Sequence, residues 1–208
     1  MRKIGIMGGT FNPVHIGHLI IAEKAREQFH LEEVLFLPCG MPYMKSEKEI
    51  LSGHIRAEMT RLAIEDNPFF DLSTIELEKE GNTYTYETLV TLHEQNPNTE
   101  YYFILGADSL WAIESWKEPS KIFQNCHILA AVRDDKSIED MQKQADILKE
   151  KFQASIFLLK TNHIEISSSM IRDFVREGNS IRYLVPEAVY DYIIKNKLYK
   201  EDSHGGAV

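Results

Sequence analysis

The sequence predicts an α/β fold: a single doubly wound parallel sheet with helices on both faces and a small helical extension at the C-terminal end. Strand-like and helix-like stretches alternate along the chain, and the helical stretches are long enough to connect parallel strands. The residues with unusual chemistry directly follow predicted strands. That position is typical of ligand sites, which gather at the carboxyl ends of the strands in such sheets.

The first predicted unit is a strand, a glycine-rich turn and a helix. An apolar run at 3–7 is followed by Gly8-Gly9-Thr10-Phe11-Asn12-Pro13, and a helical pattern then begins near His15. This order places backbone N–H groups and the positive end of a helix dipole beside the end of a strand, where phosphate binds readily. His15 and His18 are expected to share one helix face next to this phosphate site, with Gly17 between them leaving room for a phosphate.

The other strands are predicted from short apolar runs that end at turn residues. The run Val34-Leu35-Phe36-Leu37 ends at Pro38-Cys39-Gly40, and the run from 101 to 105 ends at Gly106. The predicted strands after the first are 34–37, 70–77, 101–105, 128–132 and 155–159.

The helices are predicted where apolar residues recur every three or four positions. Met59, Leu62 and Ala63 give one such stripe, and Pro186 suits the first turn of the last helix. The predicted helices are 19–30, 55–66, 85–95, 138–152, 169–176 and 186–196. Residues 1–200 are predicted to form one domain, and residues 201–208 a flexible tail.

Composition excludes several classes of protein. The net charge of −9 over 208 residues argues against binding of a nucleic-acid polymer, which needs a basic face. No apolar run approaches the roughly 20 residues of a membrane span, and no secretory leader is recognised. Cys39 and Cys126 match no metal-binding spacing and suit a reducing compartment. We therefore expect a cytoplasmic protein without a membrane partner, and the sequence leaves a homo-oligomer open.

A second group of phosphate-binding residues lies far along the chain, in Ser167-Ser168-Ser169-Met170-Ile171-Arg172. The serines are a helix N-cap signal, which on its own implies capping alone. Arg172 follows Ser168 by four residues and should lie on the same helix face. Serine hydroxyls, free helix N–H groups and a guanidinium together describe a clamp for a polyphosphate.

The two motifs, His15-Ile16-Gly17-His18 and Ser167–Arg172, resemble the signatures of a nucleotidyltransferase superfamily with a Rossmann-like sheet. In detail the chain is similar to the bacterial nicotinate-mononucleotide adenylyltransferases. Further matches, in the same order along nearly the whole chain, are Tyr84-Thr85, Gly106-Ala107-Asp108 and Trp116.

The resemblance implies transfer of an adenylyl group from ATP to nicotinate mononucleotide, giving deamido-NAD and pyrophosphate. His15, His18 and Arg172 would be the catalytic residues. The ATP-binding residues it implies are Gly8, Gly9, Thr10, Phe11, His15, His18, Gly106, Asp108, Arg133, Ser167, Ser168 and Arg172. The residues it implies for the mononucleotide are Thr10, Asn12, Lys45, Tyr84, Thr85 and Trp116.

One segment departs from the family pattern, which has Pro-Pro-His-Lys after the second strand. This chain has Pro42-Tyr43-Met44-Lys45, and a methionine neither donates a hydrogen bond nor carries charge. A role of the missing histidine is therefore absent or supplied elsewhere, for which His54 is the nearby candidate.

The metal requirement follows from the substrate. The sequence shows no set of carboxylates dedicated to a metal, so Mg²⁺ is expected to arrive on ATP and to keep several waters.

Three other functions fit the sequence less well. Phosphopantetheine adenylyltransferases are typically shorter and have threonine at the position of His15. Cytidylyltransferases carry an arginine-threonine-serine element near the C-terminus that this chain lacks. A catalytically silent adenine-nucleotide sensor would not require His15, His18 and Arg172 together.

Overall fold

The computed structural model describes residues 1–40, 50–79, 81–132, 137–161 and 164–200. The tail assigned to 201–208 lies outside these residues. Six parallel strands form one sheet in the order β3-β2-β1-β4-β5-β6. The order reverses between β1 and β4, which are neighbours. The predicted doubly wound α/β class is therefore confirmed, and its switch point lies at the carboxyl ends of β1 and β4.

Most predicted elements lie within a few residues of the observed ones. The strands are β1 (Arg2–Gly9), β2 (Glu33–Pro38), β3 (Phe70–Leu72), β4 (Thr99–Gly106), β5 (His127–Ala131) and β6 (Ile156–Leu159). The helices are α1 (Ile16–Phe29), α2 (Gly53–Ile64), α3 (Thr85–Gln95), α4 (Ala107–Ala112), α5 (Pro119–Asn125), α6 (Ile138–Phe152), α7 (Ser168–Arg176) and α8 (Glu187–Lys195), with a 3₁₀ turn η2 (Ile113–Ser115).

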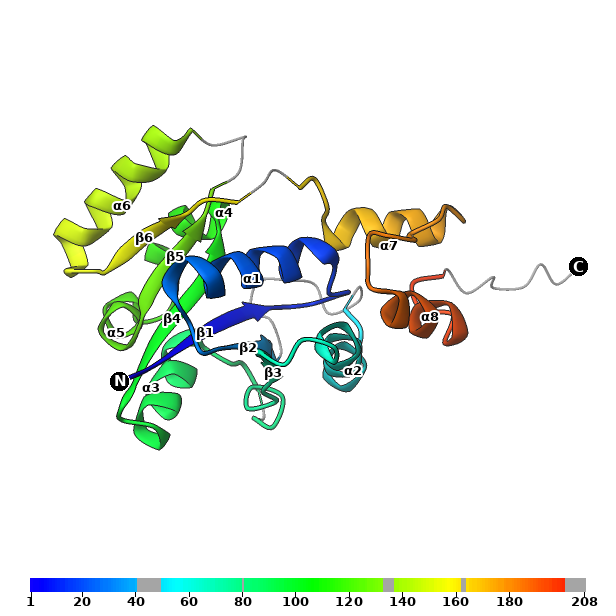
Figure 1. Ribbon diagram of the computed structural model, residues 1–208, viewed down its shortest axis with the longest axis horizontal. Coiled ribbons are helices and arrows are strands. Elements are labelled where there is room, and N and C mark those ends of the chain that lie inside the picture. The colour runs from blue at the N-terminus through cyan, green and yellow to red at the C-terminus, as the bar shows by residue number, and fades with distance from the viewer. Residues whose placement is uncertain (41–49, 80, 133–136, 162–163, 201–208) are drawn as a thin grey trace, which may run out of the picture.

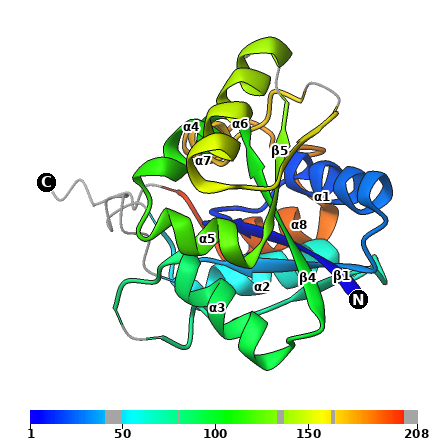
Figure 2. The same cartoon turned by 90° about the vertical axis from the view of Figure 1, so that its left-hand side faces the viewer.

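Two apolar layers cover the sheet, one on each face. Residues of α1, α2, α7 and α8 pack in one cluster of buried side chains, and residues of α3, α4, α5 and α6 pack in the other. Figure 2 shows α1 and α3 on opposite sides of the sheet. Buried side chains alternate between the two clusters along β1, β2, β4 and β5, as a sheet covered on both faces requires. The last two helices, α7 and α8, lie beyond the carboxyl end of β1 (Figure 1).

The sequence prediction was wrong in two regions. The strand predicted over 70–77 ends at Leu72, because the next residues turn: Leu77 N–H donates to the carbonyl of Thr74. The apolar side chains Ile75 and Leu77 there pack from a loop rather than from a strand. The second region is 106–125, where α4, η2 and α5 were not predicted. These helices have six, three and seven residues, which is too short for a helical period to be recognised.

Substitution of a core residue under the switch point should lower stability strongly. Leu129 on β5 is fully buried, so Leu129→Ala is expected to lower the free energy of unfolding by about 2–5 kcal/mol. The matched control is Ile147→Ala on α6, whose side chain is 53% exposed and should cost less than about 0.5 kcal/mol. Urea denaturation of the two variants measures both values. Equal losses would contradict the assignment of this core.

Candidate active site

The glycines of the first motif end β1 at the switch point. Gly8 and Gly9 are the last residues of β1, and Gly106 ends β4 and caps the N-terminus of α4. A side chain at Gly8 would meet the ring of Phe103, and a side chain at Gly9 would meet the ring of Phe11 at 2.9 Å. Both positions need glycine because aromatic rings pack directly on the strand there.

The turn after β1 is buried and irregular. Phe11 has a positive φ of 49°, and its ring is 2% exposed between Phe36 and His18. The Asn12–Pro13 peptide bond is cis. The side chain of Phe11, a residue predicted to bind ATP, is therefore part of the core.

The two histidines come together differently from the prediction. Both were expected within a helix, but His15 has extended backbone and is the N-cap of α1, and only His18 lies within the helix. The His15 N–H donates to Nδ1 of His18 at 3.2 Å, while the His18 N–H donates to the carbonyl oxygen of His15 at 2.9 Å. The rings stack with centroids 3.7 Å apart. His15 and His18 thus cap the helix and form one stacked pair beside the end of β1.

The proton position on His18 follows from this cap. A nitrogen that accepts an N–H hydrogen bond carries no proton, so neutral His18 holds its proton on Nε2. Nε2 is the ring nitrogen opposite the backbone, so His18 presents a hydrogen-bond donor away from the helix end.

The reason for glycine at position 17 also differs from the prediction. Gly17 was expected to leave room for a phosphate, but a Cβ there would lie 3.1 Å from Cε1 and Nδ1 of His15. The space beside Gly17 is therefore taken by an imidazole. The glycine allows the His15 ring to fold over the helix.

The serine–arginine motif reaches the same turn. Ser167 is the N-cap of α7, as predicted, and its Oγ accepts from the N–H of Met170 at 3.2 Å. Ser168 Oγ donates to the carbonyl oxygen of Pro13 at 2.8 Å, and Arg172 Nη1 donates to the carbonyl oxygen of Asn12 at 3.0 Å. Residues about 155 and 160 positions apart in the chain are thus in direct contact.

Arg56 is a residue of this region that the sequence analysis missed. It lies on α2, is 3% exposed, and donates to the carbonyls of Leu51, Thr10, Cys39 and Gly40 at 2.7 to 3.1 Å. Its guanidinium group therefore joins the turn after β1 to the turn after β2 through hydrogen bonds. These four carbonyl oxygens hold a buried cationic group at the carboxyl edge of the sheet.

Four other predicted residues belong to the elements on the other face of the sheet, namely Tyr84, Thr85, Asp108 and Trp116. Tyr84 is the N-cap of α3 and Thr85 is its first residue. Trp116 is half-buried, and its ring meets that of Phe103 edge-on with centroids 6.3 Å apart. Since Phe103 covers Gly8, Trp116 lies near the end of β1. Asp108 is exposed in the first turn of α4, where a carboxylate suits the helix dipole.

A buried carboxylate organises the loop before α3. Glu76 accepts hydrogen bonds from the hydroxyls of Thr83 at 3.1 Å and Thr88 at 2.8 Å. Its backbone carbonyl lies so close to Gly40 that a Cβ there would be 2.6 Å away. Glu76 therefore joins the loop before Tyr84 to the end of β2.

Some predicted residues are not placed. Lys45, with Pro42, Tyr43 and Met44, and Arg133 lie outside the described residues. His54, the candidate to replace the missing histidine, is exposed in the first turn of α2.

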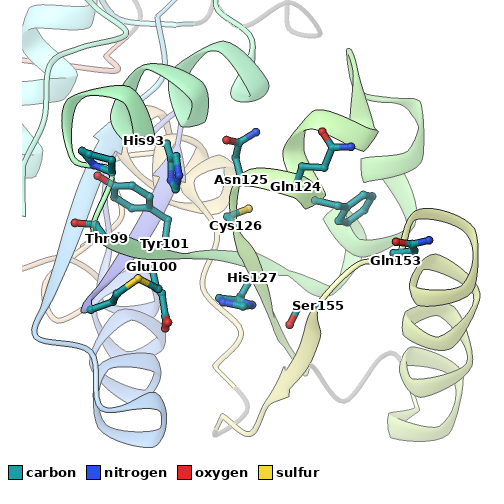
Figure 3. A pocket seen from close by; sticks show the side chains of 13 residues that line it. His93, Thr99, Glu100, Tyr101, Gln124, Asn125, Cys126, His127, Gln153 and Ser155 are labelled. Carbon is teal, nitrogen blue, oxygen red and sulfur yellow. The ribbon is translucent and has the colours of Figure 1, made fainter.

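A hollow of about 190 Å³ lies at the opposite edge of the sheet. It is lined by the amino ends of β4 and β5, including Thr99, Tyr101 and His127, and by the ends of neighbouring helices (Figure 3). Burial lowers the pKa of His127 there. None of the residues predicted for nucleotide binding lines this hollow.

The described part of the chain contains no group of three or more histidine, cysteine, aspartate or glutamate side chains placed to hold a metal ion. None of the helices within it combines the length and apolar character needed to span a bilayer.

Comparison with known proteins identifies the family of the chain. The model of the cytidylyltransferase-like family matches residues 6–174. A probable nicotinate-nucleotide adenylyltransferase of Lachnoclostridium phytofermentans is 50% identical over 199 residues, covering 96% of this chain and all of the relative. One from Dehalococcoides mccartyi is 42% identical, covering 95% of this chain and 97% of the relative.

Solved structures of similar fold carry the same kind of name. Plasmodium falciparum nicotinic acid mononucleotide adenylyltransferase complexed with APC is 26% identical with a TM-score of 0.75, and its complex with NaAD is 27% identical with a TM-score of 0.77. Each match covers 96% of this chain and 98% of the other. The chain therefore belongs to the cytidylyltransferase-like family, among the nicotinate-nucleotide adenylyltransferases.

Proposed function

We propose that this enzyme transfers the adenylyl group of ATP to nicotinate mononucleotide, giving nicotinate adenine dinucleotide and pyrophosphate in NAD biosynthesis. The observation that carries the proposal is the contact of Ser168 and Arg172 with the turn that leads to His15 and His18. Groups suited to bind phosphate, drawn from both ends of the chain, lie at one edge of the sheet. The relatives' names and the APC and NaAD complexes support this assignment.

The reaction needs no general base and no covalent enzyme intermediate. The phosphate of the mononucleotide has a second pKa of about 6 and is largely a dianion near neutral pH. Its oxygen attacks the α-phosphorus of ATP in line with the bond to the β-phosphate, and pyrophosphate leaves with the electron pair of that bond. The protein must therefore align two polyanions that repel each other and offset charge on the departing group.

His15, His18 and Arg172 carry the catalytic role in this proposal. The Nε2–H of His18 donates to phosphate oxygens of ATP as charge develops, and the stacked His15 lies beside it. Arg172, together with Ser167 and Ser168 at the start of α7, holds the pyrophosphate end.

The remaining predicted residues divide between the two substrates. For ATP, we assign the backbone at Gly8, Gly9, Thr10 and Phe11, the start of α4 at Gly106 and Asp108, and Arg133 near the adenosine. For the mononucleotide, Thr10, Asn12 and Lys45 surround the phosphate and the reacting centre, Trp116 stacks on the pyridine ring, and the backbone at Tyr84 and Thr85 binds the carboxylate. The N-terminal position of Tyr84 and Thr85 on α3 supports the last assignment, since helix N-termini bind anions.

The divalent ion of the reaction is proposed to be Mg²⁺ that enters with ATP. The side chains gathered at the β1 turn are imidazoles, guanidinium groups, hydroxyls and an amide, which suit phosphate better than a hard cation. The reaction is expected in the cytoplasm, and a homo-oligomer stays a prediction.

The activity itself is tested with three acceptors at equal concentration. Pyrophosphate release from ATP is expected with nicotinate mononucleotide, and not with pantetheine phosphate. Nicotinamide mononucleotide as the third acceptor measures the preference between acid and amide. If neither nicotinate mononucleotide nor nicotinamide mononucleotide releases pyrophosphate from ATP, the proposal is overturned.

Removing the His18 imidazole should lower turnover far more than ATP affinity. His18→Ala is expected to lower kcat by about 10²-fold or more, because one donor to developing negative charge is lost. His18→Asn is the matched variant, since its amide oxygen is an acceptor for the His15 N–H while the Nε2 donor is absent. Steady-state rates and melting curves separate the two effects. Near-normal turnover in His18→Asn would assign His18 to helix capping alone.

Removing the Trp116 ring should mainly weaken binding of the mononucleotide. Trp116→Ala is expected to raise its dissociation constant about tenfold, the size of a lost stacking contact. Calorimetry with nicotinate mononucleotide gives the value directly, and Trp116→Phe, which keeps an aromatic face, should lose less. Unchanged affinity in Trp116→Ala would make Trp116 a packing residue against Phe103.

A further inference from the structure

The chain returns to the β1 turn a third time, after α8. Lys197 and Tyr199 have positive φ angles of 53° and 64°, which turn the backbone after the helix ends at Asn196. The hydroxyl of Tyr199 then donates to Oδ1 of Asn12 at 3.0 Å. The two residues are 187 positions apart in the chain. Neither the motifs nor the resemblance singled out Tyr199.

Burial of the Tyr199 side chain keeps its hydroxyl protonated, so the hydroxyl acts as a hydrogen-bond donor. Burial raises the pKa of Tyr199 well above its usual range, and the nearby guanidinium groups of Arg172 and Arg56 lower it by less. Its proton is therefore retained at neutral pH. The Sδ of Met59 lies 3.9 Å from the hydroxyl oxygen, so the Tyr199 hydroxyl also contacts a buried side chain of the core.

The hydrogen bond fixes which way the Asn12 amide faces. Oδ1 of Asn12 also accepts from the N–H of Leu51 at 3.4 Å, so its oxygen is directed at two donors. The NH₂ group of the amide, at the other end of the same plane, is therefore turned away from Tyr199. The side chain of Asn12 is 3% exposed, and rotation of its amide would place an NH₂ donor where the Tyr199 hydroxyl now meets an oxygen acceptor.

Asn12 also carries a main-chain contact of the candidate active site. Its carbonyl oxygen accepts from Arg172 Nη1 at 3.0 Å, and its neighbour Pro13 accepts from Ser168. A shift of Asn12 would therefore move the anchor of the guanidinium assigned to pyrophosphate.

We propose that Tyr199 is a positioning residue for adenylyl transfer: its hydroxyl fixes the amide of Asn12 and, through Asn12, the guanidinium of Arg172. The inference rests on the proposed function, because Asn12 and Arg172 act on substrate only there. Tyr199 itself touches no reacting atom in this account.

The first test is Tyr199→Phe, which removes one hydroxyl and keeps the ring. We expect kcat to fall about tenfold, the rate equivalent of one lost hydrogen bond, with KM for ATP changed less than about twofold. The matched control is Tyr192→Phe on α8, whose side chain packs against the same core and whose hydroxyl forms no hydrogen bond within the described residues. Its kcat should equal that of the unmodified enzyme. Melting temperatures of both variants show whether folding is affected.

The second test asks whether Tyr199 acts through Asn12. Tyr199→Phe is combined with Asn12→Ala, which removes the acceptor of the hydroxyl. If Tyr199 acts by orienting Asn12, Tyr199→Phe should change kcat by less than about twofold when it is made in the Asn12→Ala background, because the amide that the hydroxyl orients is already absent. A residue that only supports the fold would lower kcat by the same factor in both backgrounds. If Asn12→Ala reduces the folded fraction, the same cycle with Arg172→Lys replaces it, and coupling is again expected.

The outcomes separate the two claims. An unmodified enzyme that releases no pyrophosphate would remove the proposed function. An active enzyme in which Tyr199→Phe keeps full kcat, or in which the two substitutions act independently, would overturn the role of Tyr199 alone.

Discussion

The site depends on how the turn after β1 satisfies its backbone carbonyls. The turn carries the cis Asn12–Pro13 bond and a residue with positive φ, so its backbone departs from that of a strand. Side chains donate to three of its carbonyls: Arg56 to Thr10, Arg172 to Asn12 and Ser168 to Pro13. Buried carbonyls without donors would destabilise the turn by about 1–3 kcal/mol each. The donors that satisfy them come from α2 and α7, and they draw both helices to the end of β1.

This arrangement makes one set of contacts serve both folding and chemistry. Arg56 is held by four carbonyls, which fix the position of its guanidinium group. The His15–His18 cap similarly sets both the start of α1 and the proton position on His18. Rigid placement of charge and donors before substrate arrives is what lowers a barrier between two anions.

The sequence predicted the sheet well because its signals are local. Buried parallel strands are short apolar runs, and α3 and α6 were predicted with their observed ends, Thr85–Gln95 and Ile138–Phe152. The motif residues were likewise predicted, and the structure brings His15, His18, Ser168 and Arg172 to one turn. Arg56 and Tyr199 were missed because their partners are distant backbone carbonyls and one amide, which leave no periodic pattern. The N-cap position of His15 was missed because histidine is not a preferred cap residue.

The bond between Tyr199 and Asn12 also bears on how the molecule is made. A ribosome produces Asn12 187 positions before Tyr199, so the hydrogen bond between them is absent while the intervening residues are made. Contacts across such sequence separation slow folding, because a long loop has to close before they form. A nascent chain that has not yet reached Tyr199 can build most of the sheet, yet it lacks the hydrogen bond from Tyr199 to the turn after β1.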